Sequence, residues 1–424
     1  MHGQDTGPDR GRARRALAAA AVDISPLRRH RDLRLLFAGQ GVSMFGSMIT
    51  YVALPYQAYA LSHSSLIVGL LGLAELVPLL TMPLVGGALA DAVDRRSMVR
   101  LTELLLAVAS LALAFNATAA HPRLWVLFAV SALMAGLDGL QRPSLDALLP
   151  RLVERDEIPA ASALTSMRMT VGQVAGPAVG GVLIASVGLT ATYAVDVGTF
   201  LLSLWALELM QAVPPPPDAE RPGLKSVVEG VRYARSRPEL IGTYVVDTVA
   251  MFFGMPNAVF PAVAAGLGGA GVLGLLYTAP SIGSLIATLA SGWVARVHRH
   301  GAAVCVAAAG WGAGIILFGL APDLAVALAG LAVAGAADQI SGLFRSTIWN
   351  QTIPDHLRGR LAGIEQISYS AGPLLGDVEA GSVASLVGVR ASVVSGGVLC
   401  IAGVGVAALA LPAFWRYDRR ANRP

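Results

Sequence analysis

Carboxyl groups inside long apolar segments are the residues of this sequence that could do chemistry. Glu75 follows 40 residues without Asp, Glu, Lys or Arg (Leu35–Ala74) and precedes 15 more. An ionisable group in such a segment is costly and is therefore a functional candidate. We expect Glu75 to lie near the middle of a helix and to exchange a proton. The alternative is a neutral carboxyl that holds helices together through hydrogen bonds.

Asp377 and Asp247 are two further candidate proton carriers. Asp377 and Glu379 point to different faces of one predicted helix, and Asp377 is favoured because it shares a stripe with Gln366 and Ser370. Asp247 lies six residues into its predicted helix, where an ion pair at the membrane interface is the alternative.

Charged residues at helical spacing form a second pattern. Asp138, Arg142 and Asp146 are four residues apart and therefore share one helix face. Asp338 and Arg345, which are seven residues apart, repeat the arrangement later in the chain. We interpret both sets as gating pairs near the cytoplasmic ends of their helices rather than as ligand-binding groups.

Two sets of uncharged residues are candidates for lining a cavity. The first is a polar stripe at helical spacing, formed by Gln40, Ser43, Ser47 and Tyr51. The second is a soft, adaptable surface, formed by Met251, Phe252, Met255 and Asn257. The alternatives are a hydrogen-bonded seam between helices for the first set and ordinary core packing for the second. Gln366 and Ser370 complete the candidate lining.

The sequence lacks the residue patterns of enzyme chemistry. It contains no Gly-rich phosphate loop with its lysine and no Cys/His cluster, and its two cysteines, Cys305 and Cys400, lie in apolar runs. We therefore expect no catalytic residues, no cofactor, no metal and no ATP hydrolysis, so that energy must come from an ion gradient.

Membrane-spanning helices are the elements that must position these residues. Of 424 residues, 55% are hydrophobic and 14% charged, whereas soluble proteins carry about 25% charged residues. About 20 apolar residues cross a bilayer. The apolar windows predict helices at 35–61, 66–90, 98–119, 124–148, 162–186, 189–210, 241–265, 272–295, 302–321, 324–346, 361–386 and 391–414.

Basic residues predict the orientation. The two tails and every second loop hold 26 of the 31 Lys and Arg residues, whereas the opposite loops hold Arg123 and Arg390. We therefore expect both termini to lie in the cytoplasm. The membrane that the chain crosses is expected to be the inner or plasma membrane of the cell. Residues 1–34 are predicted to form an Arg-rich cytoplasmic tail that ends in a short interfacial helix. We expect no cleavable signal peptide in this tail. Because the arginines face the membrane surface, the net charge of +4 does not indicate nucleic-acid binding.

The sequence repeats itself in two halves. Asp138 has a counterpart in Asp338, and a short motif, Gly176-Pro177-x-x-Gly180, recurs as Gly372-Pro373-x-x-Gly376. Parallel repeats of this kind are typical of secondary transporters. We predict an all-α integral membrane protein with twelve transmembrane helices in two six-helix pseudo-symmetric halves. The predicted divisions are a tail (1–34), two halves (35–210 and 241–414), a linker with an amphipathic helix (211–240) and a second tail (415–424).

The loop after the second predicted helix resembles the signature of the major facilitator superfamily, G-x-x-x-D-R/K-x-G-R-R/K. The matching residues are Gly87, Asp91, Arg95 and Arg96, and the departures are Ala92 and Asp94. We expect Gly87 to allow close approach of two helices. The resemblance implies a major facilitator fold and a gating role for this loop, with an anionic surface turn as the alternative.

A second motif resembles that of proton-linked exporters in this superfamily. Its residues are Gly172, Gly176, Pro177, Gly180 and Gly181. Small residues at this spacing make a smooth face for tight helix packing. An arginine that many drug/proton antiporters place in the outer half of the fourth helix is missing, because Arg142 lies too far toward the cytoplasm.

A finer resemblance covers nearly the whole chain and is to the enterobactin-exporter-like branch of the superfamily. The segments that carry it are Asp247–Pro256, Pro354–Arg360 with its gating candidates Arg358 and Arg360, Gly372–Asp377 and Phe414–Tyr417. The resemblance implies a monomeric proton antiporter that exports a siderophore or a similar small amphiphilic molecule across the lipid bilayer by alternating access. The alternatives are a multidrug or macrolide exporter and a non-transporting receptor. Glu75 argues against the receptor, which needs no buried titratable group.

Overall fold

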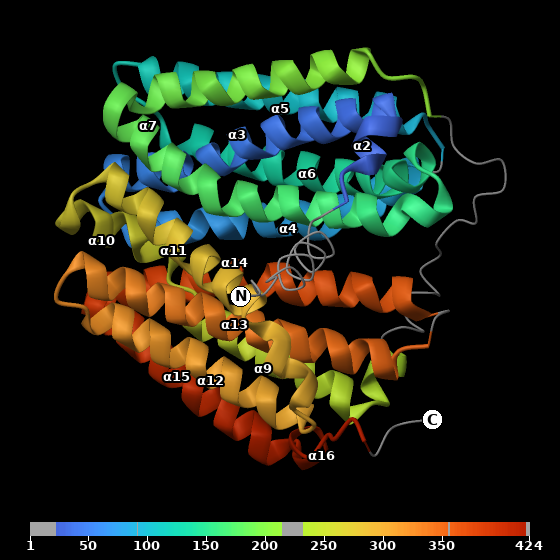
Figure 1. Ribbon diagram of the computed structural model, residues 1–424. Coiled ribbons are helices and arrows are strands. Elements are labelled where there is room, and N and C mark those ends of the chain that lie inside the picture. Colours follow the sequence, from blue (N-terminus) through green and yellow to red (C-terminus); the bar gives the residue numbers. More distant parts are fainter. Residues whose placement is uncertain (1–22, 91, 214–231, 355–356, 421–424) are drawn as a thin grey trace, which may run out of the picture.

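In the computed structural model the chain is described over residues 23–90, 92–213, 232–354 and 357–420 (Figure 1). Side chains are not described at residues 88, 90, 359, 360, 362–364 and 366–368. The described residues form helices joined by short loops, with no strand among them. Its first bundle consists of α2 (Ser25–Arg29), α3 (Arg31–Ser62), α4 (Ser65–Ala90), α5 (Arg95–Thr118), α6 (Leu124–Leu152), η1 (Arg155–Glu157) and α7 (Ile158–Glu208).

The second bundle begins after residues 214–231, which lie outside the described part of the chain. Most of the predicted amphipathic helix falls within these residues. It consists of α9 (Pro238–Gly254), η2 (Asn257–Val259), α10 (Phe260–Leu267), α11 (Ala270–Leu289), η3 (Ser291–Arg296), α12 (His300–Leu320), α13 (Leu324–Thr352), α14 (Arg358–Val387), α15 (Val389–Ala410) and α16 (Pro412–Trp415). Figure 1 shows the two bundles one above the other, the first in blue to green and the second in yellow to red.

Ten helical segments of the described chain are long and apolar enough to cross a membrane. One of them, Arg155–Glu208, has 54 residues and contains two predicted helices. It bends at Gly188, where φ is 78°, a backbone conformation that favours glycine. Gly388, with φ of 92°, separates α14 from α15 at the corresponding place in the second bundle. The number of twelve spans and the exact division into tails, halves and linker stay predictions.

The predicted continuous helix 241–265 is wrong. Helix α9 ends at Gly254, Met255 and Pro256 are not helical, and the chain resumes as η2 and α10. Proline has no N–H to donate and disfavours a helical conformation in the residue before it, so the backbone breaks here. The break lies in the middle of the molecule and exposes backbone groups that need other partners.

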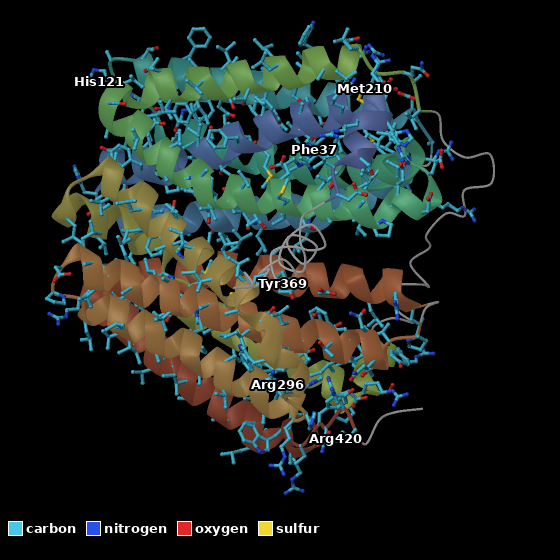
Figure 2. All side chains as sticks on the ribbon, in the orientation of Figure 1. Phe37, His121, Met210, Arg296, Tyr369 and Arg420 are labelled. Atoms are coloured by element: carbon cyan, nitrogen blue, oxygen red, sulfur yellow. The ribbon has the colours of Figure 1, made fainter. Side chains whose placement is uncertain are left out.

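The two bundles meet most closely at one end of the molecule. We call the end that holds Met210 and Arg420 the linker end, and the end that holds His121 the distal end (Figure 2). In the distal half, a Cβ on Gly181 of α7 would lie 2.8 Å from Gly274 Cα of α11. Such spacing allows only glycine, so backbone packs directly against backbone between the bundles.

A second glycine contact closes the distal half between α4 and α14. A Cβ on Gly69 would collide with the backbone of Asp377, and one on Gly381 would lie 3.0 Å from Leu66 Cα. Both contacts join residues of different bundles, and they lie toward the distal ends of α4 and α14. The distal side is therefore tightly packed.

Candidate functional site

Two adjoining cavities lie between the bundles at mid-depth. The first has a volume of about 400 Å³ and the second of about 310 Å³. They share a wall formed by Met48, Tyr51, Met255, Asn257 and Tyr277. Aromatic rings, methionines and a few polar groups are the usual lining of small-molecule sites, whose volumes run from about 300 to 1,000 Å³.

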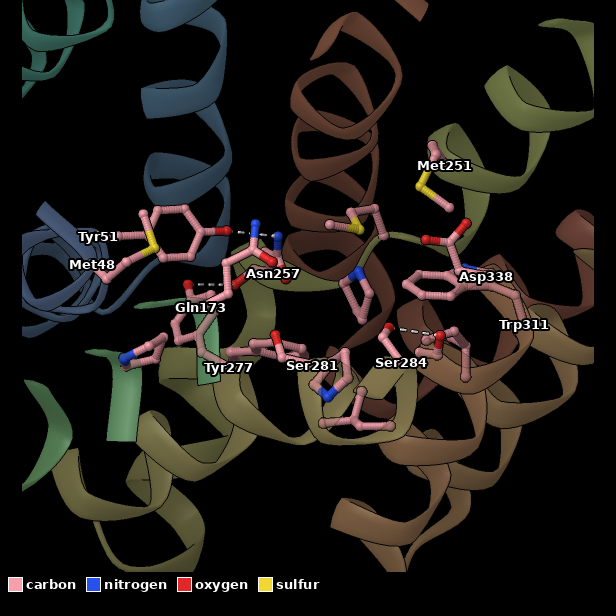
Figure 3. Close-up of a pocket in the computed structure, with 18 residues that line it drawn as sticks. Met48, Tyr51, Gln173, Met251, Asn257, Tyr277, Ser281, Ser284, Trp311 and Asp338 are labelled. Atoms are coloured by element: carbon pink, nitrogen blue, oxygen red, sulfur yellow. Dashed lines mark hydrogen bonds between the residues drawn. The ribbon is translucent and has the colours of Figure 1, made fainter. Parts of the chain in front are cut away.

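The break between α9 and α10 forms the centre of this wall (Figure 3). Trp311 Nε1 donates a hydrogen bond to the Gly254 carbonyl at 2.9 Å, and Asp377 Oδ1 accepts one from the Ala258 N–H at 3.0 Å. Side chains thus satisfy backbone groups on both sides of the break. Between them, Asn257 Nδ2 donates to the Tyr51 hydroxyl at 3.3 Å and so bridges the two bundles.

Three carboxyl groups from three helices line the second cavity. They are Glu75 on α4, Asp138 on α6 and Asp377 on α14. Glu75 interacts electrostatically with each of the other two. The fold therefore brings the predicted proton carriers Glu75 and Asp377 together, whereas their role in proton transfer stays a prediction.

The predicted ladder on α6 forms no direct salt bridge, although Arg142 interacts electrostatically with both Asp138 and Asp146. Among the described residues no salt bridge joins Arg142 to Asp138 or Asp146, and all three side chains are exposed. Asp138 instead faces the second cavity. The four-residue spacing therefore brings the three charges near one another without a direct ion pair, and their gating role stays a prediction.

A buried ion cluster occupies the second bundle. Arg345 Nη1 pairs with Asp247, and its Nη2 lies 3.3 Å from Asp338 Oδ1. The guanidinium stacks over the Tyr369 ring at 5.2 Å. The predicted Asp338–Arg345 pair is present, although its gating role stays a prediction. The ion pair considered for Asp247 is present, but it lies inside the bundle rather than at an exposed end, because the Asp247 side chain is 5% exposed.

The signature loop is held within the first bundle. Arg96 Nε donates to the Leu207 carbonyl at 2.6 Å and Arg96 Nη2 to the Glu208 carbonyl at 3.0 Å, so the arginine caps the end of α7. Arg95 is buried. Asp94, a departure from the signature, caps α5 by accepting a hydrogen bond from the Ser97 N–H at 2.7 Å.

The structure does not confirm the predictions for two other residues of this loop, Asp91 and Gly87. Asp91 lies outside the described residues. The close helix approach predicted for Gly87 is wrong, since nothing described lies within 4 Å of a Cβ placed there. The adjacent Gly86 makes that approach, against the Leu140 backbone of α6.

The exporter-like motif packs α7 on two neighbours. Gly172, Gly176 and Gly180 face Met44, Met48 and Ile49 of α3. The other neighbour is α11, because the Pro177 carbonyl and Gly181 contact Gly274. In the second bundle, Gly372 and Gly376 face Met251 and Phe252 of α9 in the same manner.

The candidate cavity residues divide into two groups. Those that line the cavities are Ser47, Tyr51, Met251, Met255 and Asn257. Those that do not are Gln40, Ser43, Phe252 and Ser370. Phe252 packs edge-on against Phe253 with ring centroids 4.9 Å apart. The side chains of Gln366 and Arg360 lie outside the described part, and Arg358 is exposed at the start of α14.

Gln40 and Ser43 bind a residue that the sequence did not single out. Both donate to Glu103 Oε1 on α5, at 2.8 and 3.0 Å. The alternative of a hydrogen-bonded seam therefore describes this part of the stripe. A further seam is formed by Asp196 of α7, which accepts hydrogen bonds from Thr50 and Ser110, both at 2.6 Å.

The fold and the cavity define a class of protein. A helical membrane bundle in two halves, with a ligand-sized cavity at a broken helix between them, is a transporter of the major facilitator type rather than an enzyme. The chain belongs to the transmembrane secretion effector family of that superfamily, whose model matches residues 21–423.

Comparisons with individual proteins agree with this assignment. The chain is 28% identical over 389 residues to the enterobactin exporter EntS of Citrobacter koseri and to that of Shigella boydii, covering 90% of this chain and 92% of each relative. Among solved structures, the nucleoside transporter NupG matches with a TM-score of 0.70 at 12% identity, covering 91% of this chain and 100% of that one. A bacterial homologue of the human lysosomal transporter Spinster matches with a TM-score of 0.69 at 16% identity, covering 93% and 98%.

Proposed function

We propose that this chain exports a siderophore or a similar small amphiphilic molecule and is driven by antiport of protons. The observation that carries the proposal is the mid-depth cavity in which Glu75, Asp138 and Asp377 surround a broken helix. Its combination with relatives named as enterobactin exporters supports a siderophore as the cargo. The chain acts as a monomer in the inner or plasma membrane, with both termini in the cytoplasm.

The lining of the cavities selects among cargoes by charge. Acidic residues in the lining are Glu75, Asp138, Asp338 and Asp377, and the described residues that line the two cavities include no Lys or Arg. Carboxyl groups attract cations and accept hydrogen bonds from hydroxyl groups, whereas they repel anions. An uncharged molecule rich in hydroxyl donors, or a cationic one, therefore fits better than a polyanion.

The contacts between the bundles support alternating access. The distal half is closed by glycine contacts at Gly69, Gly181 and Gly381. The described salt bridges, by contrast, all join residues of the same bundle, as in Arg96–Glu208 and Arg345–Asp338. The bundles can therefore rock about the central cavity without breaking a described ion pair, and this state would load cargo from the linker end.

Proton coupling follows from electrostatics within the cavity. Neighbouring carboxylates in a site of low polarity cannot all be charged without cost, so at least one holds a proton when the cavity lacks a cation. Release of that proton would make the cavity more negative and more attractive to cargo, whereas uptake would favour cargo release. Glu75 and Asp377 are the proposed carriers.

The function is tested by transport into everted membrane vesicles, with enterobactin as the probe. Respiration acidifies the vesicle interior, so wild-type vesicles should accumulate enterobactin and lose it when a protonophore is added. Glu75→Gln should abolish accumulation. Glu379→Gln is the matched control, because Glu379 lies on α14 outside the cavity lining and should retain transport. Accumulation that survives the protonophore would refute proton antiport. Transport of a macrolide but not of enterobactin would make the chain a drug exporter.

The orientation is tested by labelling single cysteines on intact cells with an impermeant maleimide. The native Cys305 and Cys400 are buried and should not react. His121→Cys at the distal end should be labelled, whereas Asp23→Cys and Arg420→Cys should react only after the membrane is opened. Labelling of either terminus on intact cells would reverse the proposed orientation.

A further inference from the structure

A carboxyl group is buried inside the first bundle, outside the two central cavities. The side chain of Glu103 on α5 is fully buried, at 0% exposure. It lines neither cavity. Its Oε1 accepts hydrogen bonds from Gln40 Nε2 at 2.8 Å and from Ser43 Oγ at 3.0 Å. Its other oxygen, Oε2, is also buried and has no hydrogen-bond partner among the described residues.

These contacts suit the neutral acid rather than the carboxylate. A buried carboxylate needs a counter-charge and donors on both of its oxygens. The described groups that hydrogen-bond to Glu103 are all uncharged: Gln40 and Ser43 donate to Oε1. The Ser203 hydroxyl, which accepts from Gln40 at 3.4 Å, lies beside the same carboxyl. The charged groups around it are Asp138 on α6 and Arg168 and Asp196 on α7. Two of these three are acidic, and the guanidinium of Arg168 stacks over the Phe37 ring at 5.9 Å.

A small cavity lies on the linker side of Gln40, the residue that separates it from this carboxyl. It has a volume of about 130 Å³ and lies between α3, α6 and α7, with Gln40, Asp146 and Arg168 in its lining. Such a volume holds several water molecules, each of which takes about 30 Å³ in the liquid. Gln40 therefore touches the small cavity and Glu103 at once. A change in the Gln40 rotamer would bring water to the carboxyl.

On the other side, Glu103 lies close to the central site. Thr102 Oγ1 donates a hydrogen bond to Gln141 Oε1 at 2.8 Å, which fixes α5 against α6. Asp138 lies one helical turn from Gln141, interacts electrostatically with Glu103 and lines the second cavity. Glu103 thus interacts with one residue of the central cavity, Asp138, and with one residue of the small cavity, Gln40.

We propose that Glu103 is a second proton-binding site, through which protons pass from Asp138 to the linker end along a route separate from the cargo. In each passage Glu103 first releases its Oε2 proton to water in the small cavity. Asp138, which has taken a proton from the central cavity, then gives it up: its O–H bond breaks as an O–H bond forms again on Glu103 Oε2. The role of Glu103 in transport rests on the proposed proton antiport. The binding of a proton to Glu103 is a separate claim that does not depend on antiport.

Occupancy is tested without any cargo by infrared spectroscopy of the purified protein in lipid nanodiscs. A protonated carboxyl has a carbonyl stretch that a carboxylate lacks. Glu103→Gln should remove one component of that band at neutral pH, and Ser43→Ala should shift the same component because Oε1 loses a donor. Glu154→Gln, at an exposed residue of the same bundle, should leave the band unchanged. An unchanged band in folded Glu103→Gln would overturn the proposal.

The route is tested in proteoliposomes with enterobactin as the probe. Glu103→Gln should abolish accumulation driven by a pH gradient, while exchange of labelled for unlabelled enterobactin, which needs no net proton movement, should continue. Full pH-driven accumulation in this variant would exclude Glu103 from the route. If wild-type protein exchanges enterobactin but ignores the pH gradient, the proposed antiport fails while the infrared result still decides whether Glu103 binds a proton. Should Glu103→Gln fail to fold, the band shift in Ser43→Ala carries the occupancy test.

Discussion

The carboxylate of Asp377 on α14 accepts a hydrogen bond from the backbone N–H of Ala258, 3.0 Å away, directly after the break between α9 and α10. The same carboxylate lines the second cavity near Glu75. One side chain thus belongs to the acidic site and also holds the backbone segment that places Asn257 in the wall of the two cavities. A change in the protonation of Asp377 would alter this hydrogen bond and could move the segment.

Substitution of Asp377 should separate its charge from its hydrogen bond. Asp377→Asn keeps an oxygen that accepts from Ala258, so the fold and cargo exchange should survive while pH-driven transport falls. Asp377→Ala leaves the buried Ala258 N–H unpaired, which costs about 1–3 kcal/mol, and should also lower the melting temperature. Thermal unfolding and transport measured on both variants check this. Equal melting temperatures for the two variants would show that the hydrogen bond is not a structural support.

The glycine contact between α7 and α11 should control the closed state of the distal end. Gly181→Leu places a side chain where Gly274 Cα lies, so the distal contact should open and the molecule should favour a distal-open state. Labelling of an introduced distal cysteine should become faster and transport should fall. Gly198→Leu is the matched control on the same helix, because no described neighbour lies within 4 Å of a Cβ there. Equal labelling rates in both variants would contradict the assignment.

Helix positions were predictable because apolar length is a strong signal, but the break in the seventh predicted helix was not. Pro55 lies inside α3 and Pro143 inside α6, and both helices continue through their prolines. At Pro256 the chain breaks because Trp311 and Asp377 satisfy the freed backbone groups. Those partners come from α12 and α14, so the outcome depends on tertiary contacts that local sequence does not contain.

The site was predictable in part for a similar reason. Glu75 and Asp377 stood out because apolar residues surround them, whereas Glu103 did not. It immediately precedes an apolar window and lies three residues after Arg100, so the local sequence does not mark it as buried. Gln40 and Tyr51 lie on one stripe of α3, yet the stripe packs on α5 near the linker end and meets the cavity only at mid-depth.

Removal of Arg345 should be strongly destabilising. Its side chain is 2% exposed and compensates the buried charge of Asp247. Loss of one partner of a buried ion pair costs about 3–5 kcal/mol, so Arg345→Gln should unfold at a clearly lower temperature than wild type. Adding Asp247→Asn should recover part of the loss, because it removes the uncompensated charge. No recovery in the double variant would show that Asp247 is not the main partner.

The hydrogen bond from Trp311 to the Gly254 carbonyl should hold the broken end of α9 in place. Trp311→Phe keeps a large ring in the cavity wall but removes the donor, at a cost of about 1 kcal/mol for a typical hydrogen bond and more if the carbonyl stays buried and unpaired. Because the end of α9 and Asn257 form the shared wall of the two cavities, looser positioning should weaken cargo binding more than it lowers stability. Trp205→Phe is the matched control, since Trp205 is 65% exposed on the outer face of α7. Binding of enterobactin, followed by fluorescence in nanodiscs, should weaken in the first variant and not in the second. If both variants bind as tightly as wild type, the hydrogen bond at Gly254 is not needed to shape the site.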